Sequence, residues 1–145
     1  MLHLSTVEST TLELLKKLQQ LPVLCNTRLV GGTALALQLG HRKSVDLDFF
    51  GQINVDSQDL KEALRTLGTL TILNDSKNIH IYVLYDVKID IVNYTYPWLD
   101  DVVYKDGIRL ASPRDIPAMK ITAIEGRGTK KDFVDIYFLL KKYSL

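Results

Sequence analysis

Residues 31–48 of the chain read GGTALALQLGHRKSVDLD, and this stretch decides the expected fold. A short strand is predicted at residues 27–30, where the chain runs directly into two glycines. Residues 33–39 have the alanine and leucine content of a short helix that ends at a further glycine. Residues 45–50 form a second predicted strand, because hydrophobic and acidic residues alternate along it. The stretch therefore predicts a strand, a helix and a second strand in close succession.

Two acidic residues, Asp46 and Asp48, lie two positions apart on the second predicted strand. Side chains alternate along a strand, so both carboxylates should lie on one face while Val45, Leu47 and Phe49 point into the core. Neighbouring carboxylates repel each other, and bound Mg²⁺ or Mn²⁺ removes this cost because such cations take hard oxygen ligands. The pair indicates metal binding, and the alternative is an exposed strand with two ordinary solubilising aspartates.

The Gly31-Gly32-Thr33 turn comes directly before the predicted helix and leaves unpaired backbone N–H groups at a helix N-terminus. Glycine lets the backbone approach phosphate oxygens closely and adopt a positive φ, and the Thr33 hydroxyl can donate to the same oxygens. The turn therefore indicates an anion site, with a plain tight turn as the alternative.

A third carboxylate, Asp90, lies on the predicted strand 87–94 and shares a face with Lys88 and Val92. Together with Asp46 and Asp48 it would complete a ligand set for two metal ions roughly 4 Å apart, the arrangement that supports in-line phosphoryl transfer. Three acids and a phosphate-binding turn then form one coherent site.

The rest of the chain predicts an α+β domain, in which helices flank a small mixed β-sheet. Ser5 and Glu8 have the spacing of a capping box before an amphipathic helix that reaches Pro22. Asp56 is placed to cap a second helix, which should end near Gly68.

Three strands are predicted after that helix, at residues 69–73, 79–84 and 87–94, and they suggest an antiparallel meander with a tight turn near Tyr85. Two further helices are predicted at the C-terminal end, one entered at Asp115 and the other capped by Thr129.

Composition narrows the class of protein. The 145 residues fit a single minimal domain spanning residues 1–145, with 46% hydrophobic and 24% charged residues, as in folded cytoplasmic proteins. No run approaches the ~18 apolar residues of a membrane span, and the N-terminus lacks a secretory pattern, so we expect no membrane association. The net charge of +1 produces no long-range attraction for nucleic acid. Cys25, the one cysteine, is expected to be a buried free thiol.

Four segments together resemble the AbiEii-type nucleotidyltransferases of the DNA polymerase β superfamily. They are GGTALAL at residues 31–37, HRKSVDLDFF at 41–50, KIDIV at 88–92 and MKITAIEGRGTKKDFVDIYFLL at 119–140. The resemblance covers most of the chain and implies a polymerase-β-like core. It also implies transfer of a nucleoside monophosphate from an NTP to an acceptor hydroxyl, either an RNA 3′ end or a protein side chain.

The resemblance also implies roles for individual residues. The glycine turn, its hydroxyl residue and Ser44 would hold the triphosphate, and Asp46 and Asp48 would bind two Mg²⁺ or Mn²⁺ ions. Asp90 would be the third metal-binding carboxylate and would help to deprotonate the attacking hydroxyl. In the late segment, Lys120 would neutralise triphosphate charge, and Asp132 and Asp135 match acids of the family's nucleotide-binding motif.

Structural explanations stay open for the late residues. Thr129 and Asp132 form a possible capping box, and Lys131 with Asp135 is an i, i+4 pair. Lys120 would by default be a surface lysine on a helix. Arg127, between two glycines, is suited to a helix C-terminus.

Family members often occur as toxins beside a cognate antitoxin, so the resemblance implies such a partner. Many relatives are longer than this chain. Two other functions remain open: a non-catalytic regulator that binds nucleotide or a partner with the same fold, and a metal-dependent phosphohydrolase that uses the same acids on water. The Gly31 to Thr33 turn argues against the phosphohydrolase, because a bound triphosphate explains the turn better.

Overall fold

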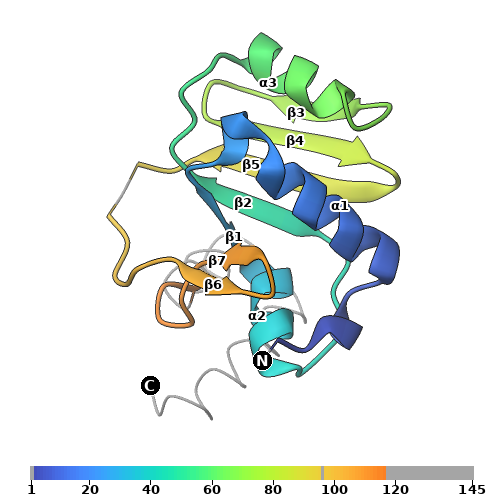
Figure 1. Cartoon of the computed structure of the whole chain (residues 1–145). Coiled ribbons are helices and arrows are strands. Elements are labelled where there is room, and N and C mark those ends of the chain that lie inside the picture. Colours follow the sequence, from blue (N-terminus) through green and yellow to red (C-terminus); the bar gives the residue numbers. More distant parts are fainter. Residues whose placement is uncertain (1, 96, 117–145) are drawn as a thin grey trace.

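The structure is a computed structural model that describes residues 2–95 and 97–116 (Figure 1). Within these residues lie seven strands: β1 (Thr27–Val30), β2 (Leu47–Gly51), β3 (Thr71–Asp75), β4 (Ile79–Leu84), β5 (Val87–Asn93), β6 (Val103–Lys105) and β7 (Ile108–Leu110). The same part of the chain holds helices α1 (Ser9–Gln20), α2 (Gly31–Leu39) and α3 (Ser57–Arg65), and the 3₁₀ turns η1 (Leu4–Thr6) and η2 (Pro22–Leu24).

The strands form one mixed sheet in the order β3-β4-β5-β2-β1-β7-β6. Strands β2 and β5 are parallel, as are β1 and β7, and the other neighbours are antiparallel. Figure 1 shows α1 and α3 on one side of this sheet, with α2 continuing directly from β1. The predicted α+β class with a small mixed sheet and flanking helices is confirmed.

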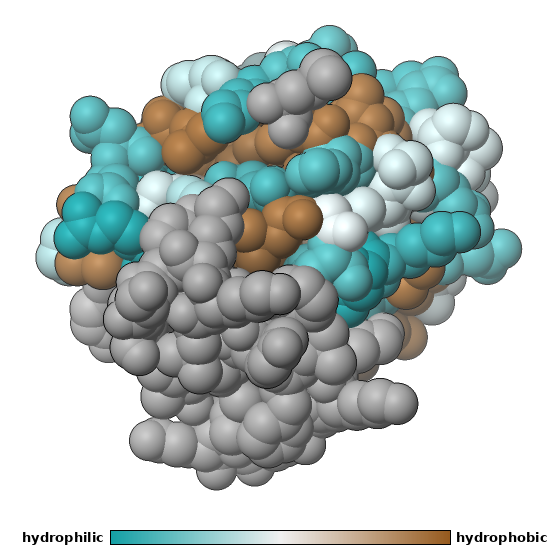
Figure 2. All heavy atoms as spheres, turned by 90° about the horizontal axis from the view of Figure 1, so that it is seen from below, coloured by the Kyte–Doolittle hydropathy of each residue, from teal (hydrophilic) through white to brown (hydrophobic). Residues whose placement is uncertain are grey.

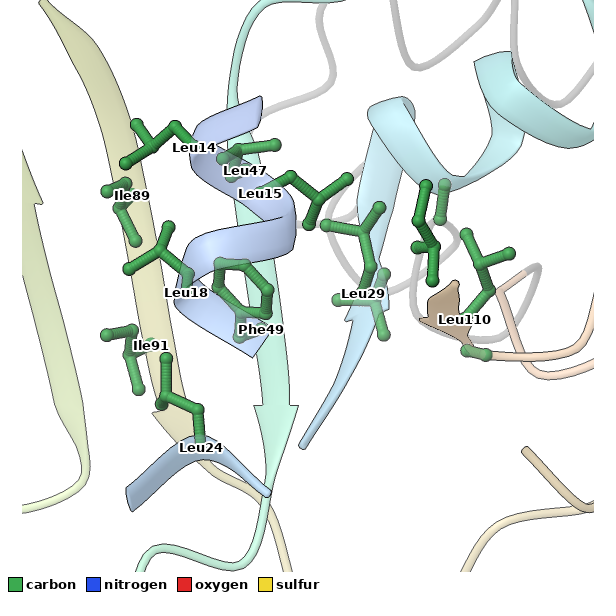
Figure 3. Packing of buried hydrophobic residues seen from close by; sticks show 14 of the residues in the cluster. Leu14, Leu15, Leu18, Leu24, Leu29, Leu47, Phe49, Ile89, Ile91 and Leu110 are labelled. Atoms are coloured by element: carbon green, nitrogen blue, oxygen red, sulfur yellow. The ribbon is translucent and has the colours of Figure 1, made fainter. Parts of the chain in front are cut away.

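The core lies between α1 and the central strands (Figure 3). Burying a leucine or isoleucine of this kind contributes roughly 1.5–3 kcal/mol. Side chains alternate along a strand. Every second residue of β2 and β5 packs against α1, and the intervening residues therefore lie on the opposite face of the sheet. The buried set comprises Leu14, Leu15 and Leu18 of α1, Leu47 and Phe49 of β2, and Ile89 and Ile91 of β5.

Most local predictions around this core are confirmed. Helix α2 ends at Gly40, whose φ of +66° fits the predicted glycine stop. The Asp56 carboxylate caps α3 by accepting the backbone N–H of Asp59 at 2.9 Å. The meander β3-β4-β5 is present, and its second turn contains Tyr85 and Asp86, both with positive φ.

Three local predictions are wrong. The capping box at Ser5 and Glu8 does not form, because residues 4–6 make a 3₁₀ turn and α1 starts at Ser9 without a side-chain cap from Glu8. Val45 is 54% exposed instead of buried, because β2 starts two residues after it. Cys25 is exposed, because it follows η2 in a turn at the surface.

The hairpin formed by β6 and β7 was not predicted. Each strand has three residues, which is too short for a period-2 pattern to stand out. Asp106 and Gly107 connect them with φ of +52° and +76°. An Asp-Gly pair is the preferred sequence of a two-residue hairpin turn, so this dipeptide was the available signal.

A charged cluster lies beneath α3, centred on Asp75 at the end of β3. Its carboxylate accepts hydrogen bonds from Ser57 Oγ at 2.7 Å and Tyr82 Oη at 3.2 Å, and it lies 2.5 Å from His80 Nδ1. Lys61 Nζ is 3.1 Å away. Burial alone would raise the pKa of Asp75, but the hydrogen bonds from His80, Ser57 and Lys61 outweigh it and hold that pKa well below its usual range.

We predict that Asp75 stabilises the folded protein and that the size of this contribution changes with pH. An aspartate whose pKa is lower in the folded protein stabilises it above the unfolded pKa of ~3.9, and this contribution disappears as the pH falls through the folded pKa. We expect Asp75→Asn to lower the free energy of unfolding by about 2 kcal/mol at pH 7, with a smaller difference at pH 3. Urea denaturation at both pH values measures this.

The control for Asp75→Asn is Asp86→Asn, which changes an exposed aspartate in the β4-β5 turn. This variant should match the wild type at both pH values, since asparagine also tolerates a positive φ. Equal loss of stability at pH 3 and pH 7 in Asp75→Asn would contradict an electrostatic role for the cluster.

The surface gives little direct indication of function. Figure 2 shows hydrophobic areas bordered by hydrophilic residues on the face it presents, a mixture that is ordinary for protein surfaces. Among the described residues, no helix combines the length and the apolar character needed to cross a membrane.

Candidate functional site

The centre of the candidate site is a pair of carboxylates on neighbouring strands. Asp48 of β2 and Asp90 of β5 are direct register partners, and Asp48 is also paired with Val30 of β1. Parallel strands lie about 4.8 Å apart, so side chains of paired residues on one face are neighbours. Both aspartates lie on the face opposite α1, because the residues beside them in sequence are packed against that helix.

The glycine turn lies against this pair. Gly31 follows Val30, opens α2 and has a φ of +71°. A Cβ atom at Gly31 would overlap Oδ2 of Asp48, so the turn approaches the carboxylate as closely as a glycine allows. Gly31 and Gly32 are both half-buried, and the N-cap residue Val30 has no polar side chain to occupy the N–H groups of the first turn.

The hydroxyls of Thr33 and Ser44 were expected to contact phosphate directly, but both form hydrogen bonds within the protein. Thr33 is 1% exposed, and its hydroxyl donates to the backbone carbonyl of Asp46. The Ser44 hydroxyl lies 2.6 Å from Thr33 Oγ1 and is also buried. Each hydroxyl has one proton, so Ser44 donates to Thr33 while Thr33 donates to Asp46, and both protons are used within the protein. The two residues therefore tie the start of α2 to the segment that enters β2.

Asp46 is half-buried and lies just before β2. Among residues 2–95 and 97–116, no three or more His, Cys, Asp or Glu side chains are grouped closely enough to hold a metal ion. The three aspartates thus do not form a ready-made cluster, although Asp48 and Asp90 are register partners. Mg²⁺ usually takes one or two carboxylates together with water and substrate phosphates, so this oxygen-donor pair fits Mg²⁺ or Mn²⁺.

One basic residue on the same face had no assigned role from the sequence. Lys88 of β5 lies two residues before Asp90, and its Nζ is 3.8 Å from Asp90 Oδ1. The Lys88 side chain is 39% exposed and that of Asp90 is 23% exposed. Side chains two positions apart in a strand lie on the same face, so the sequence already indicated that Lys88 is a neighbour of Asp90.

Three predicted functional residues of the late segment lie outside the described residues, as do the two predicted C-terminal helices beyond Ile116. These residues are Lys120, Asp132 and Asp135, and Arg127, for which a helix C-terminus was expected, also lies outside the described residues. A shallow surface pocket lined by Cys25, Asn26 and Gln52 is separate from the site, since it lies at the far end of β1 and β2 from Gly31 and Asp48.

Comparison with known proteins shows the family to which the chain belongs. A family model described as "Nucleotidyl transferase AbiEii toxin, Type IV TA system" matches residues 13–145. An uncharacterized protein of Aquifex aeolicus (strain VF5) is 37% identical over 136 residues, which cover 91% of this chain and 66% of that protein. The chain therefore spans just under two thirds of the length of this curated relative.

Solved structures show the same fold. The crystal structure of JHP933 from Helicobacter pylori matches with a TM-score of 0.62 and 23% identity, covering 94% of this chain and 68% of that one. ANT(2″)-Ia in complex with adenylyl-2″-tobramycin matches with a TM-score of 0.61 and 14% identity, covering 92% of this chain and 86% of that one. The predicted polymerase-β-like nucleotidyltransferase fold is thereby confirmed.

Proposed function

Because the chain belongs to the AbiEii family of nucleotidyl transferase toxins, we propose that it transfers a nucleoside monophosphate from an NTP to an acceptor hydroxyl. The observation that carries this proposal is the register of Asp48 with Asp90, next to a glycine turn whose first residue touches the Asp48 carboxylate. A triphosphate substrate is bound in two ways: carboxylates hold its divalent cations, and backbone N–H groups donate to its phosphate oxygens. The arrangement supplies both within one region of the sheet.

In the proposed reaction, the acceptor oxygen attacks the α-phosphorus of the NTP and the bond to the β-phosphate breaks. Pyrophosphate leaves, and the proton of the acceptor hydroxyl goes to Asp90. The N–H groups of Gly31 and Gly32 hold phosphate oxygens at the start of α2. Thr33 and Ser44 do not contact the substrate in this scheme. Their hydrogen bonds fix the segment that carries Asp46 relative to the glycine turn.

Asp46, Asp48 and Asp90 would hold the divalent cations, Mg²⁺ or Mn²⁺. Bound cations of this kind supply the positive charge that stabilises phosphoryl transfer. Lys120 would add charge at the triphosphate, and Asp132 and Asp135 would complete the nucleotide site.

The test is incubation of the full chain with each α-³²P-labelled NTP, Mg²⁺, and either total RNA or total protein from the source cells. We expect covalent label in one acceptor pool with one preferred NTP, and the mass added to the acceptor identifies nucleotide and target together. Bound but never covalent label would indicate a non-catalytic regulator. Release of hydrolysed nucleotide without any acceptor would indicate a phosphohydrolase.

We further propose a cognate antitoxin as a partner, supported by the family's description as part of a type IV toxin-antitoxin system. Co-expression with the neighbouring gene should relieve any growth arrest caused by this chain. Growth arrest that persists with every neighbouring gene would contradict this pairing.

A further inference from the structure

Like charges occupy directly opposed positions at the candidate site. Asp48 and Asp90 are register partners on adjacent strands, an arrangement that destabilises a sheet when both side chains are charged. A positive charge near two such carboxylates lowers the cost of their repulsion when no divalent cation is bound.

Lys88 supplies such a charge from within the same strand. Its ammonium is 3.8 Å from Asp90 Oδ1, and the register places it opposite Val83 of β4, which has no charge. The Lys88 side chain is partly exposed, and its four-carbon stem allows the ammonium to turn toward solvent or toward a bound phosphate. The contact with Asp90 is thus reversible.

We propose that Lys88 is a positioning residue that holds Asp90 in the metal-free protein and must move aside when a divalent cation binds to Asp48 and Asp90. This inference rests on the proposed function, because it concerns the same cation site. The ammonium and the cation share one carboxylate and repel each other, so Lys88 weakens metal binding in the absence of nucleotide. A triphosphate gives the displaced ammonium an anionic partner, which couples cation binding to NTP binding.

The inference is tested by titrating Mn²⁺ into the full chain in a calorimeter without nucleotide. A unit charge about 6 Å from a divalent ion in a water-like medium changes its affinity about tenfold, so Lys88→Met should bind Mn²⁺ about tenfold more tightly than the wild type. Lys88→Arg keeps the charge and should restore wild-type affinity. The matched control is Lys17→Met, which removes an ammonium 3.5 Å from Glu13 on α1, at the other face of the sheet.

Thermal unfolding without metal provides a second measurement. Lys88→Met should lower the melting temperature in the wild-type background but not in an Asp90→Asn background, since the contact is already lost there. This double-mutant cycle separates a contact with Asp90 from a general effect of the substitution on the strand.

The outcomes are distinguishable. Equal Mn²⁺ affinity in wild type and Lys88→Met, or weaker binding in the variant, overturns the role of Lys88 and leaves the proposed function standing. Weaker NTP binding with unchanged Mn²⁺ affinity also overturns it, because Lys88 would then be a phosphate ligand only. Failure of every variant to bind Mn²⁺, both alone and with an NTP present, overturns the cation site itself, and with it the proposed function, because Mg²⁺ and Mn²⁺ are also held by substrate phosphates.

Discussion

Asp48→Asn is expected to reduce the rate of nucleotidyl transfer by about 10²- to 10³-fold while the protein stays folded. Asp48 touches the glycine turn through Gly31 and is paired with Asp90, so it stands where the phosphate site and the cation site meet. Asparagine keeps the size of the side chain but removes the charge that binds a cation. The transfer rate should therefore fall far more than the stability.

Two measurements check this prediction: label transferred per minute at saturating NTP and Mg²⁺, and the urea midpoint of unfolding. Because the amide is nearly isosteric and relieves repulsion from Asp90, the free energy of unfolding should stay within about 1 kcal/mol of wild type. Asp101→Asn, which changes an exposed aspartate, should leave both quantities unchanged. A folded Asp48→Asn protein that keeps a tenth or more of the wild-type rate would exclude Asp48 from the site.

The strand, turn and helix around Gly31 were predictable because their signals are local. Two glycines, a run of alanine and leucine, and alternation of acids with buried residues each specify a backbone conformation within a few positions. The same alternation placed Lys88 and Asp90 on one face. Such signals depend only on residues near one another in the chain.

The order of the sheet could not be read in this way. Strand β5 pairs with β2 in parallel although α3, β3 and β4 lie between them in sequence. The register that brings Asp48 to Asp90 follows from packing Leu47 and Ile89 under α1, which is a property of the folded core. Sequence therefore indicated which acids share a face, whereas tertiary packing decided which two are neighbours.

Hydrogen bonds between segments that are distant in the chain also could not be predicted from the sequence. Thr33 was expected to donate to phosphate because hydroxyl residues commonly do so at helix N-termini. Its proton instead reaches the carbonyl of Asp46, which is close only after the chain has turned back from α2 to β2. The hydroxyl positions the acid-bearing segment, a role that no local pattern indicates.

Gly31→Ala should lower nucleotidyl transfer by about a hundredfold, because a shift of about 1 Å in a catalytic group can have this effect. The new methyl group would occupy the space of Asp48 Oδ2, so the carboxylate must rotate away or the turn must move. Alanine at a φ of +71° also costs roughly 1–2 kcal/mol of stability, since the left-handed region disfavours a Cβ.

Gly107→Ala separates these two effects. Gly107 has a φ of +76°, but a Cβ there would meet nothing within 4 Å, so this variant carries the backbone cost alone. It should lose a similar amount of stability by urea denaturation and keep the wild-type transfer rate. If Gly31→Ala instead transferred nucleotide as fast as Gly107→Ala, close contact between the turn and Asp48 would have no part in the reaction. A hundredfold difference between two glycines of nearly equal φ would assign the loss to Asp48 and the turn, because backbone strain is common to both.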